Sequence, residues 1–168
     1  LDLDVHQGDG TASICENIDN IFTCSIHCKN NFPFDKKNSN LDVPIDDEVN
    51  DLKYINILTK TLDQIESNFT PDIVFYDAGV DVHSNDDLGN LNLTDDGIKK
   101  RDEIVCEYFK EKKIPLCTVI GGGYSKNRQE LASRHFSIFE TVSKTYLWIF
   151  LINSLNQPKN YSYSQYNL

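Results

Sequence analysis

The chain has 168 residues, which is enough for one domain with a buried core. Its net charge of −10 argues against nucleic-acid binding, because that binding relies on Lys and Arg side chains that neutralise phosphates. The longest apolar run, residues 146–152, is far too short to span a membrane.

Apolar runs and amphipathic stripes predict an alternation of strands and helices. In chain order, we expect a strand over 1–5, a strand over 21–27, a long loop over 29–49, a helix over 50–69, a strand over 72–76, a helix over 94–113, a strand over 116–120, a helix over 127–153 and a polar tail over 155–168. In the first helix the apolar stripe includes Leu52, Leu58 and Ile65. The second helix begins at Thr94, a residue type that caps helix N-termini. This alternation predicts an α/β fold with a mostly parallel sheet flanked by helices.

The five cysteines indicate a reducing compartment with free thiols, because their number is odd and three of them lie in apolar stretches. We therefore expect a nuclear or cytoplasmic protein rather than a secreted one. Cys24 and Cys28 have the spacing of a zinc pair, but the segment around them alternates like a strand, which favours packed thiols.

The first ten residues carry the strongest functional signal. Asp2, Asp4 and His6 alternate with aliphatic residues, so at strand period they point to one face. Polar groups clustered in this way need partners, since buried charge is costly unless it is paired or bound to a metal. Gly8 and Gly10 then allow a tight turn. The alternative is an ordinary strand followed by a polar turn.

Two later strands also end in unusual residues. The strand over 72–76 leads to Asp81, and the strand over 116–120 leads to Gly121, Gly122, Gly123 and Tyr124. Because the carboxyl ends of parallel strands share one edge of a sheet, we expect Asp4, His6, Asp81 and Tyr124 to converge in one cleft. Taken alone, the glycine run is equally typical of a flexible turn.

Two carboxylates and one imidazole form a ligand set that suits zinc and leaves coordination positions free for water and substrate. At the mouth of such a site, the Tyr124 hydroxyl is a candidate donor to a developing oxyanion.

In combination these motifs resemble the zinc-dependent histone deacetylase family, and are most similar to its class IV branch and bacterial acetoin-utilisation-type relatives. The resemblance lies in residues 2–12, 25–27, 31–34, 41–45, 76–82, 86–93 and 121–124. It implies an arginase/deacetylase-type fold that is incomplete at its N-terminal side, with residues 1–154 forming the C-terminal half of the domain and 155–168 the tail. We therefore expect the chain to be part of a longer protein.

The resemblance also implies roles for individual residues. Asp4, His6 and Asp81 match the zinc ligands of the family, and Tyr124 matches the tyrosine that hydrogen-bonds the acyl carbonyl. The other implied positions are Asp2 and Asp9, which match aspartates that orient two tandem active-site histidines; Asp2, Asp4, His6, Ser25 and Ile26, which match a monovalent-cation site, usually potassium; and Phe34, Gly122 and Gly123, which match the substrate channel.

The tandem histidine pair of the family is missing from this chain, because His6, His27, His83 and His135 are nowhere adjacent. We expect the pair upstream, in a parent protein that hydrolyses N-acyl-lysine in a protein or peptide, or an acetylated polyamine, and we expect this piece alone to be inactive and poorly soluble or oligomeric. One alternative is an inactive relative that acts as a binding module. Another is an arginase-like dinuclear hydrolase, which normally needs more carboxylates than Asp2 and Asp4 supply.

Overall fold

The computed structural model describes residues 1–147. Its elements, in chain order, are α1 (Asp9–Cys15), β1 (Cys24–Cys28), β2 (Leu41–Ile45), α2 (Asp51–Asn68), β3 (Val74–Asp77), α3 (Asp95–Glu111), β4 (Leu116–Val119), α4 (Arg128–Val142) and the π-helical turn η1 (Ser143–Leu147). The predicted α/β fold is confirmed. The last part of the third predicted helix, the boundary at residue 154 and the tail lie outside the described residues.

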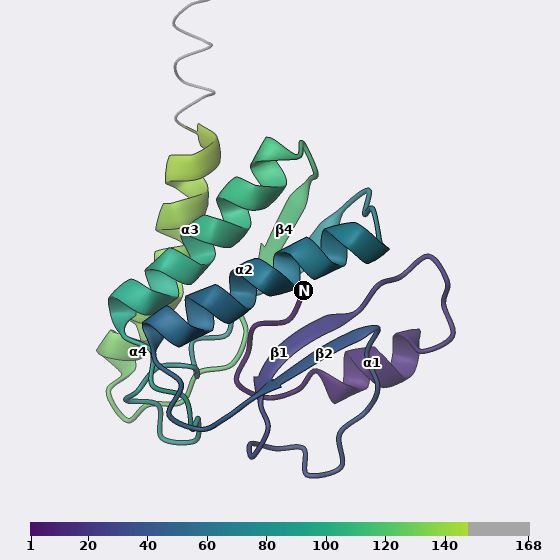
Figure 1. The fold of residues 1–168 in the computed structure, drawn as a ribbon. Helices are drawn as coiled ribbons and strands as arrows, with labels where there is room; N and C mark the ends of the chain where they lie inside the picture. Colours follow the sequence, from purple (N-terminus) through teal and green to yellow (C-terminus); the bar gives the residue numbers. More distant parts are fainter. Residues whose placement is uncertain (148–168) are drawn as a thin grey trace, which may run out of the picture.

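The sheet consists of two parallel pairs joined by the N-terminal segment. β1 pairs with β2, and β3 pairs with β4. Asp2 lies between the pairs, since it forms parallel bridges to Ser25 of β1 on one side and to Asp77 of β3 on the other. The spatial order is therefore β2, β1, the segment 1–5, β3 and β4 (Figure 1).

The predicted strand over 1–5 is wrong as a continuous strand, and its backbone amides explain why. The amides of Asp4 and His6 donate to the carboxylates of Asp2 and Asp4, at 3.0 and 2.9 Å. The amide of Val5 donates to the Asp81 carboxylate at 2.8 Å. Since these donors are engaged by side chains, the sheet ladder stops and the chain turns at its carboxyl edge.

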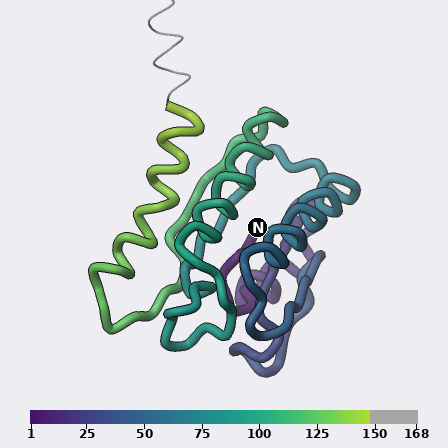
Figure 2. The backbone as a smooth tube through the Cα atoms, turned by 60° about the vertical axis from the view of Figure 1, so that its left-hand side comes forward, coloured from purple at the N-terminus to yellow at the C-terminus, as the bar shows by residue number. Residues whose placement is uncertain are grey.

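Helices α2 and α3 lie side by side across one face of the sheet, and α4 packs against α3 (Figures 1 and 2). The N-cap residues Asn50 and Thr94 accept hydrogen bonds from the first turns of α2 and α3, as predicted for Thr94. The predicted stripe of α2 is wrong at Leu52, which is 74% exposed. Tyr54 takes the core position instead and is fully buried.

Two elements were missed. The predicted loop over 29–49 contains β2, in which Pro44 interrupts the apolar pattern; Pro is tolerated there because β2 is an edge strand. The glycine-rich stretch after His6 forms the short helix α1 rather than only a turn, and it buries Ala12. The second strand also starts later than predicted, at Cys24.

The opposite face of the sheet is exposed along β3 and β4. Val74 and Tyr76 of β3 are buried beneath the helices, whereas Phe75 between them is 62% exposed. Ile73 and Val119 are 50% and 42% exposed, and a groove of about 640 Å³ runs beside them. Parallel sheets normally carry helices on both faces, and within residues 1–147 no helix covers this part of the sheet.

The structure bears on two further expectations. All five cysteines are free thiols, and Cys24 and Cys28 are buried on β1, as the packed-thiol interpretation predicted. Within residues 1–147, none of the helices has the length and apolar character needed to cross a membrane.

Candidate metal centre

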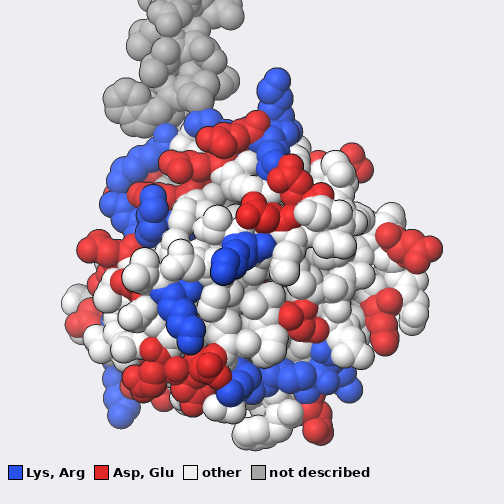
Figure 3. Space-filling model, viewed as in Figure 1, with Lys and Arg blue, Asp and Glu red and all other residues white. Residues whose placement is uncertain are grey.

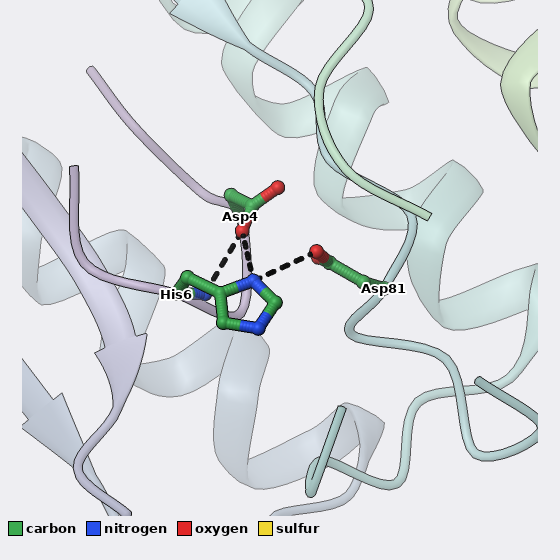
Figure 4. Close-up of side chains that lie close together, drawn as sticks. All are labelled: Asp4, His6 and Asp81. Carbon is green, nitrogen blue, oxygen red and sulfur yellow. Dashed lines mark hydrogen bonds and ion pairs between the residues drawn. The ribbon is translucent and has the colours of Figure 1, made fainter. Parts of the chain in front are cut away.

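Three of the predicted site residues meet beyond the carboxyl edge of the sheet. Asp4 lies near the end of the N-terminal segment 1–5, His6 directly follows this segment, and Asp81 follows β3 (Figure 4). His6 Nδ1 lies 2.9 Å from Asp4 Oδ1 and 3.2 Å from Asp81 Oδ2. The convergence of these three side chains was predicted from the strand ends, and the structure brings them together.

The remaining carboxylate oxygens are held by backbone amides. Asp81 Oδ1 accepts the amide of Val5 at 2.8 Å, and Asp4 Oδ2 accepts the amide of Gly122 at 2.7 Å. Each carboxylate is therefore fixed through one oxygen and presents the other to His6. Outer hydrogen bonds of this kind orient metal ligands and influence metal affinity strongly.

The geometry and chemistry of the cluster fit a zinc ion. Tetrahedral zinc with bonds of about 2.1 Å separates its ligand atoms by about 3.4 Å, and the ligand atoms here lie within 4.8 Å of one another. Nitrogen and carboxylate oxygen are common zinc ligands. Asp4, His6 and Asp81 are thus the residues that would hold the ion, and three protein ligands leave a coordination position open.

The electrostatics of the cluster favour a cation. Hydrogen bonds to Asp4 and then Asp81 raise the pKa of His6 to about 10. Burial raises the pKa of Asp81 to about 6 and that of Asp2 to about 7, and it also raises the pKa of Asp77. Burial therefore disfavours the ionised form of these three carboxylates, and a cation bound beside them would offset that cost.

Two positions beside the cluster require glycine, because their backbones approach the carboxylates closely. A Cβ on Gly122 would lie 2.2 Å from Asp81 Oδ2 and 2.4 Å from Asp4 Oδ2. A Cβ on Gly79 would lie 2.5 Å from Asp4 Oδ2. The glycine run after β4 is therefore a close-packed wall of the site, which decides against the flexible-turn alternative.

Tyr124 follows this wall, and its backbone is held on both sides. Its amide donates to Asp86 Oδ2 at 2.6 Å, and its carbonyl accepts the amide of Asp87 at 3.0 Å. Asp86 Oδ1 also accepts the amides of Leu88 and Gly89, both at 2.9 Å. The Tyr124 side chain is 59% exposed. Asp86 is not among the site residues predicted from the sequence, and no local signal marks it.

The residues predicted to bind a monovalent cation lie on neighbouring backbones. The carbonyl of Asp2 accepts the amide of Ile26 at 3.0 Å, and the amide of Cys28 donates to Val5 at 2.9 Å, so the segment with Asp4 and His6 runs along β1. Ser25 Oγ lies 3.0 Å from His27 Nδ1. Asp9, predicted to orient a histidine, is the first residue of α1.

The predicted channel residue Phe34 is 86% exposed, and its ring packs edge to face against that of Phe32, with 6.3 Å between the ring centroids. Their loop is tied to the loop that holds Tyr124, because the Asn31 side chain donates to the carbonyl of Leu88 at 2.8 Å. Gly123, in the same glycine run as Gly122, lies against Val80.

The charged side chains do not form a single-sign surface on the face that Figure 3 shows. Acidic and basic residues are interspersed there, with uncharged surface between them. This face therefore offers no continuous basic surface for a nucleic acid, in agreement with the net charge of −10.

Comparison with known families gives one domain match. The family described as "Histone deacetylase domain" matches residues 1–139. An uncharacterized protein of Picosynechococcus is 42% identical over 146 residues, which are 87% of this chain and 49% of that protein. Histone deacetylase 2 of Arabidopsis thaliana is 33% identical over 133 residues, which are 76% of this chain and 34% of that protein. The chain thus spans half or less of these relatives.

Solved structures show the same fold. An HDAC homolog from Aquifex aeolicus superposes with a TM-score of 0.70 at 26% identity, over 84% of this chain and 40% of that one. An acetylpolyamine aminohydrolase from Burkholderia pseudomallei superposes with a TM-score of 0.71 at 20% identity, over 86% of this chain and 44% of that one. These likenesses confirm the predicted arginase/deacetylase-type fold.

Proposed function

Because this chain belongs to the histone deacetylase family, we propose that it supplies the metal-binding part of a zinc-dependent enzyme that hydrolyses N-acyl-lysine. The observation that carries the proposal is the meeting of Asp4, His6 and Asp81 at the carboxyl edge of the sheet. The motif around His6 and Gln7 favours the class IV branch and its bacterial relatives.

A bound zinc ion would supply Lewis acidity and lower the pKa of water to about 7. The protein groups have separate tasks. The amides of Val5 and Gly122 keep the two carboxylates aimed at one point. The Tyr124 hydroxyl donates a hydrogen bond to the acyl oxygen as negative charge develops on it. Its backbone is held in place by Asp86 and Asp87.

The general base is the group that this chain does not provide. His27 and His83 are buried, with His27 on β1 and His83 beside Asp95, and His135 packs against the glycine wall. We therefore place the tandem histidine pair in the half of the domain that the relatives have in addition, where Asp2 and Asp9 orient it. Potassium, bound near Asp2 and Ser25, would be a second ion.

The substrate class rests on the relatives and on the exposed aromatic side chains. One structural neighbour is named an acetylpolyamine aminohydrolase, and another HDAC homolog was solved with SAHA. Phe32, Phe34 and Tyr124 are all more than half exposed on loops that are linked by hydrogen bonds. They are suited to line a channel for the aliphatic part of an acyl-lysine in a peptide or of an acetylated polyamine.

Two measurements test the proposal. The 168-residue chain is expected to bind one equivalent of Zn²⁺ in an isothermal titration, and Asp81→Ala is expected to abolish binding; two equivalents would favour the dinuclear alternative. In the full-length protein, Asp81→Ala and Tyr124→Phe are expected to abolish turnover of an acetyl-lysine peptide. Zinc binding without any turnover by the full-length wild type would instead establish the binding-module alternative.

A further inference from the structure

A charged pair is completely buried in the core beneath the metal centre. Arg101 and Asp102 of α3 are 0% and 1% exposed. Arg101 Nε donates to Asp102 Oδ1 at 2.9 Å, and the Tyr76 hydroxyl donates to the same oxygen at 2.5 Å. Burying two charges is expensive even when they are paired, so a buried pair at this place calls for an explanation beyond packing.

The explanation lies in Nη1, a guanidinium nitrogen that does not bond Asp102. Arg101 Nη1 donates to the carbonyl of Gly79 at 2.6 Å and to the carbonyl of Leu3 at 3.3 Å. Leu3 immediately precedes Asp4, and Gly79 lies two residues before Asp81. One side chain therefore joins the two separate segments that carry the metal ligands.

The arrangement exploits properties that are specific to arginine. The planar guanidinium has five donors in a fixed fork, so it can hold Asp102 with Nε while Nη1 reaches the two carbonyls. The Asp102 carboxylate, which also accepts the Tyr76 hydroxyl, holds the guanidinium in one orientation. The ring of Tyr76 also packs against the guanidinium, with 5.9 Å between the Arg101 Cζ and the ring centroid. A lysine ammonium is a point donor on a flexible stem and cannot keep all three partners.

We propose that Arg101 is a positioning residue of the metal centre, which sets the separation of Asp4 from Asp81 by bonding the backbones of Leu3 and Gly79. This inference rests on the proposed metal-dependent function, but the contacts themselves do not depend on it. The remote partners of metal ligands commonly change affinity by about 10- to 100-fold, and Arg101 acts on the two ligand segments together.

The test compares Arg101→Lys with Tyr76→Phe in the full 168-residue chain. Both variants perturb the same buried network, but Tyr76→Phe leaves the two carbonyl bonds of Arg101 in place. We expect Arg101→Lys to weaken Zn²⁺ binding by at least about tenfold, whereas Tyr76→Phe stays within about twofold of the wild type. Equal Zn²⁺ affinities for Arg101→Lys and the wild type would overturn the proposal.

Hydrogen exchange provides a readout that needs no metal. Without Zn²⁺, Arg101→Lys is expected to accelerate exchange in residues 1–8 and 77–83 and to leave the pair β1 and β2 unchanged. Acceleration of exchange throughout the chain, or none in these two segments, would show that Arg101 only fills the core. If the wild type binds no Zn²⁺, the proposed metal function fails, and this exchange pattern still decides the positioning role.

A third measurement applies if Arg101→Lys does not fold. In the wild type labelled with ¹⁵N-arginine, addition of Zn²⁺ is expected to shift the Arg101 guanidinium resonance while that of the exposed Arg128 stays constant. An Arg101 resonance that does not respond to Zn²⁺ would contradict the proposed connection.

Discussion

Replacing Gly122 by alanine would put a methyl group directly against the two metal-binding carboxylates. The new Cβ would lie 2.2 Å from Asp81 Oδ2 and 2.4 Å from Asp4 Oδ2, while real Cβ contacts are essentially never below 3.0 Å. The first oxygen would have to withdraw by about 0.8 Å, the difference between 3.0 and 2.2 Å, and the second by about 0.6 Å. Both displacements fall on carboxylates that would bind the proposed zinc ion. Asp81 Oδ2 is the oxygen that faces His6, and Asp4 Oδ2 is the oxygen held by the Gly122 amide.

The size of these displacements sets the expected effect. Metal–ligand distances tolerate deviations of about 0.2 Å, so the displacement of Asp81 Oδ2, the oxygen that faces His6, would be about four times that tolerance. The Gly122 amide that holds Asp4 would also have to shift. We expect Gly122→Ala to weaken Zn²⁺ binding by at least about 10- to 100-fold, which corresponds to about 1.4 to 2.8 kcal/mol.

The assay is a competition titration of Zn²⁺ between the chain and a chromophoric chelator, combined with thermal unfolding without metal. Gly10→Ala is the matched control. A Cβ on Gly10 meets nothing within 4 Å, and because Gly10 lies in α1, alanine is expected to stabilise the chain by about 0.5 to 1 kcal/mol. A Gly122→Ala variant that binds Zn²⁺ within twofold of wild type would refute the assignment of these carboxylates as ligands.

Three further outcomes are expected. Asp86→Ala in the full-length protein is expected to lower kcat for an acetyl-lysine peptide at least about tenfold, since the Asp86 carboxylate holds the Tyr124 amide. Asp87→Ala is the control and should leave kcat unchanged, because Asp87 contacts Tyr124 through its backbone amide. Equal losses of kcat in the two variants would contradict the role of Asp86. Phe75→Asp is expected to shift the isolated chain toward monomer in light scattering. Phe136→Asp on α4 is the control and is not expected to do so, although the two side chains are similarly exposed at 62% and 59%. Self-association that persists in Phe75→Asp would show that the exposed sheet face does not cause it. Free Zn²⁺ at about 100 times its Kd is expected to raise the free energy of unfolding by about 2.7 kcal/mol, measured by denaturant titration with and without chelator, and a gain that persists in Asp81→Ala would place the ion elsewhere.

The metal ligands could be predicted from sequence because each follows an apolar run that forms part of the sheet. Asp4 and His6 are two residues apart at the end of the N-terminal segment, and Asp81 follows β3 after a short turn. Since parallel segments end at the same edge, placing the segments was enough to place the side chains. The capping of α3 by Thr94 was predictable for a similar reason, because it depends on one residue and the helix that follows it.

The supporting residues could not be predicted, because their roles depend on contacts between distant parts of the chain. The bond from the Gly122 amide to Asp4 spans 118 residues, and the bond from Arg101 to Leu3 spans 98. Asp86 stands in an acidic pair that is typical of a solvated loop, and only the folded chain brings it to Tyr124. The strand β2 was missed because Pro44 is disfavoured in strands generally but tolerated at an edge.

The same hydrogen bonds that end the sheet also build the metal centre. The amides of Asp4, Val5 and His6 leave the sheet ladder and donate to the carboxylates of residues 2, 81 and 4. Without a cation, the fold must keep those carboxylates buried, and the raised pKa values of Asp2 and Asp81 reflect the cost of ionising them there. Binding of a divalent cation offsets that cost, so metal affinity and the stability of this edge of the sheet are coupled. Arg101 supplies a positive charge on the opposite side of the same backbone segments, which links the helix layer to the geometry of the site.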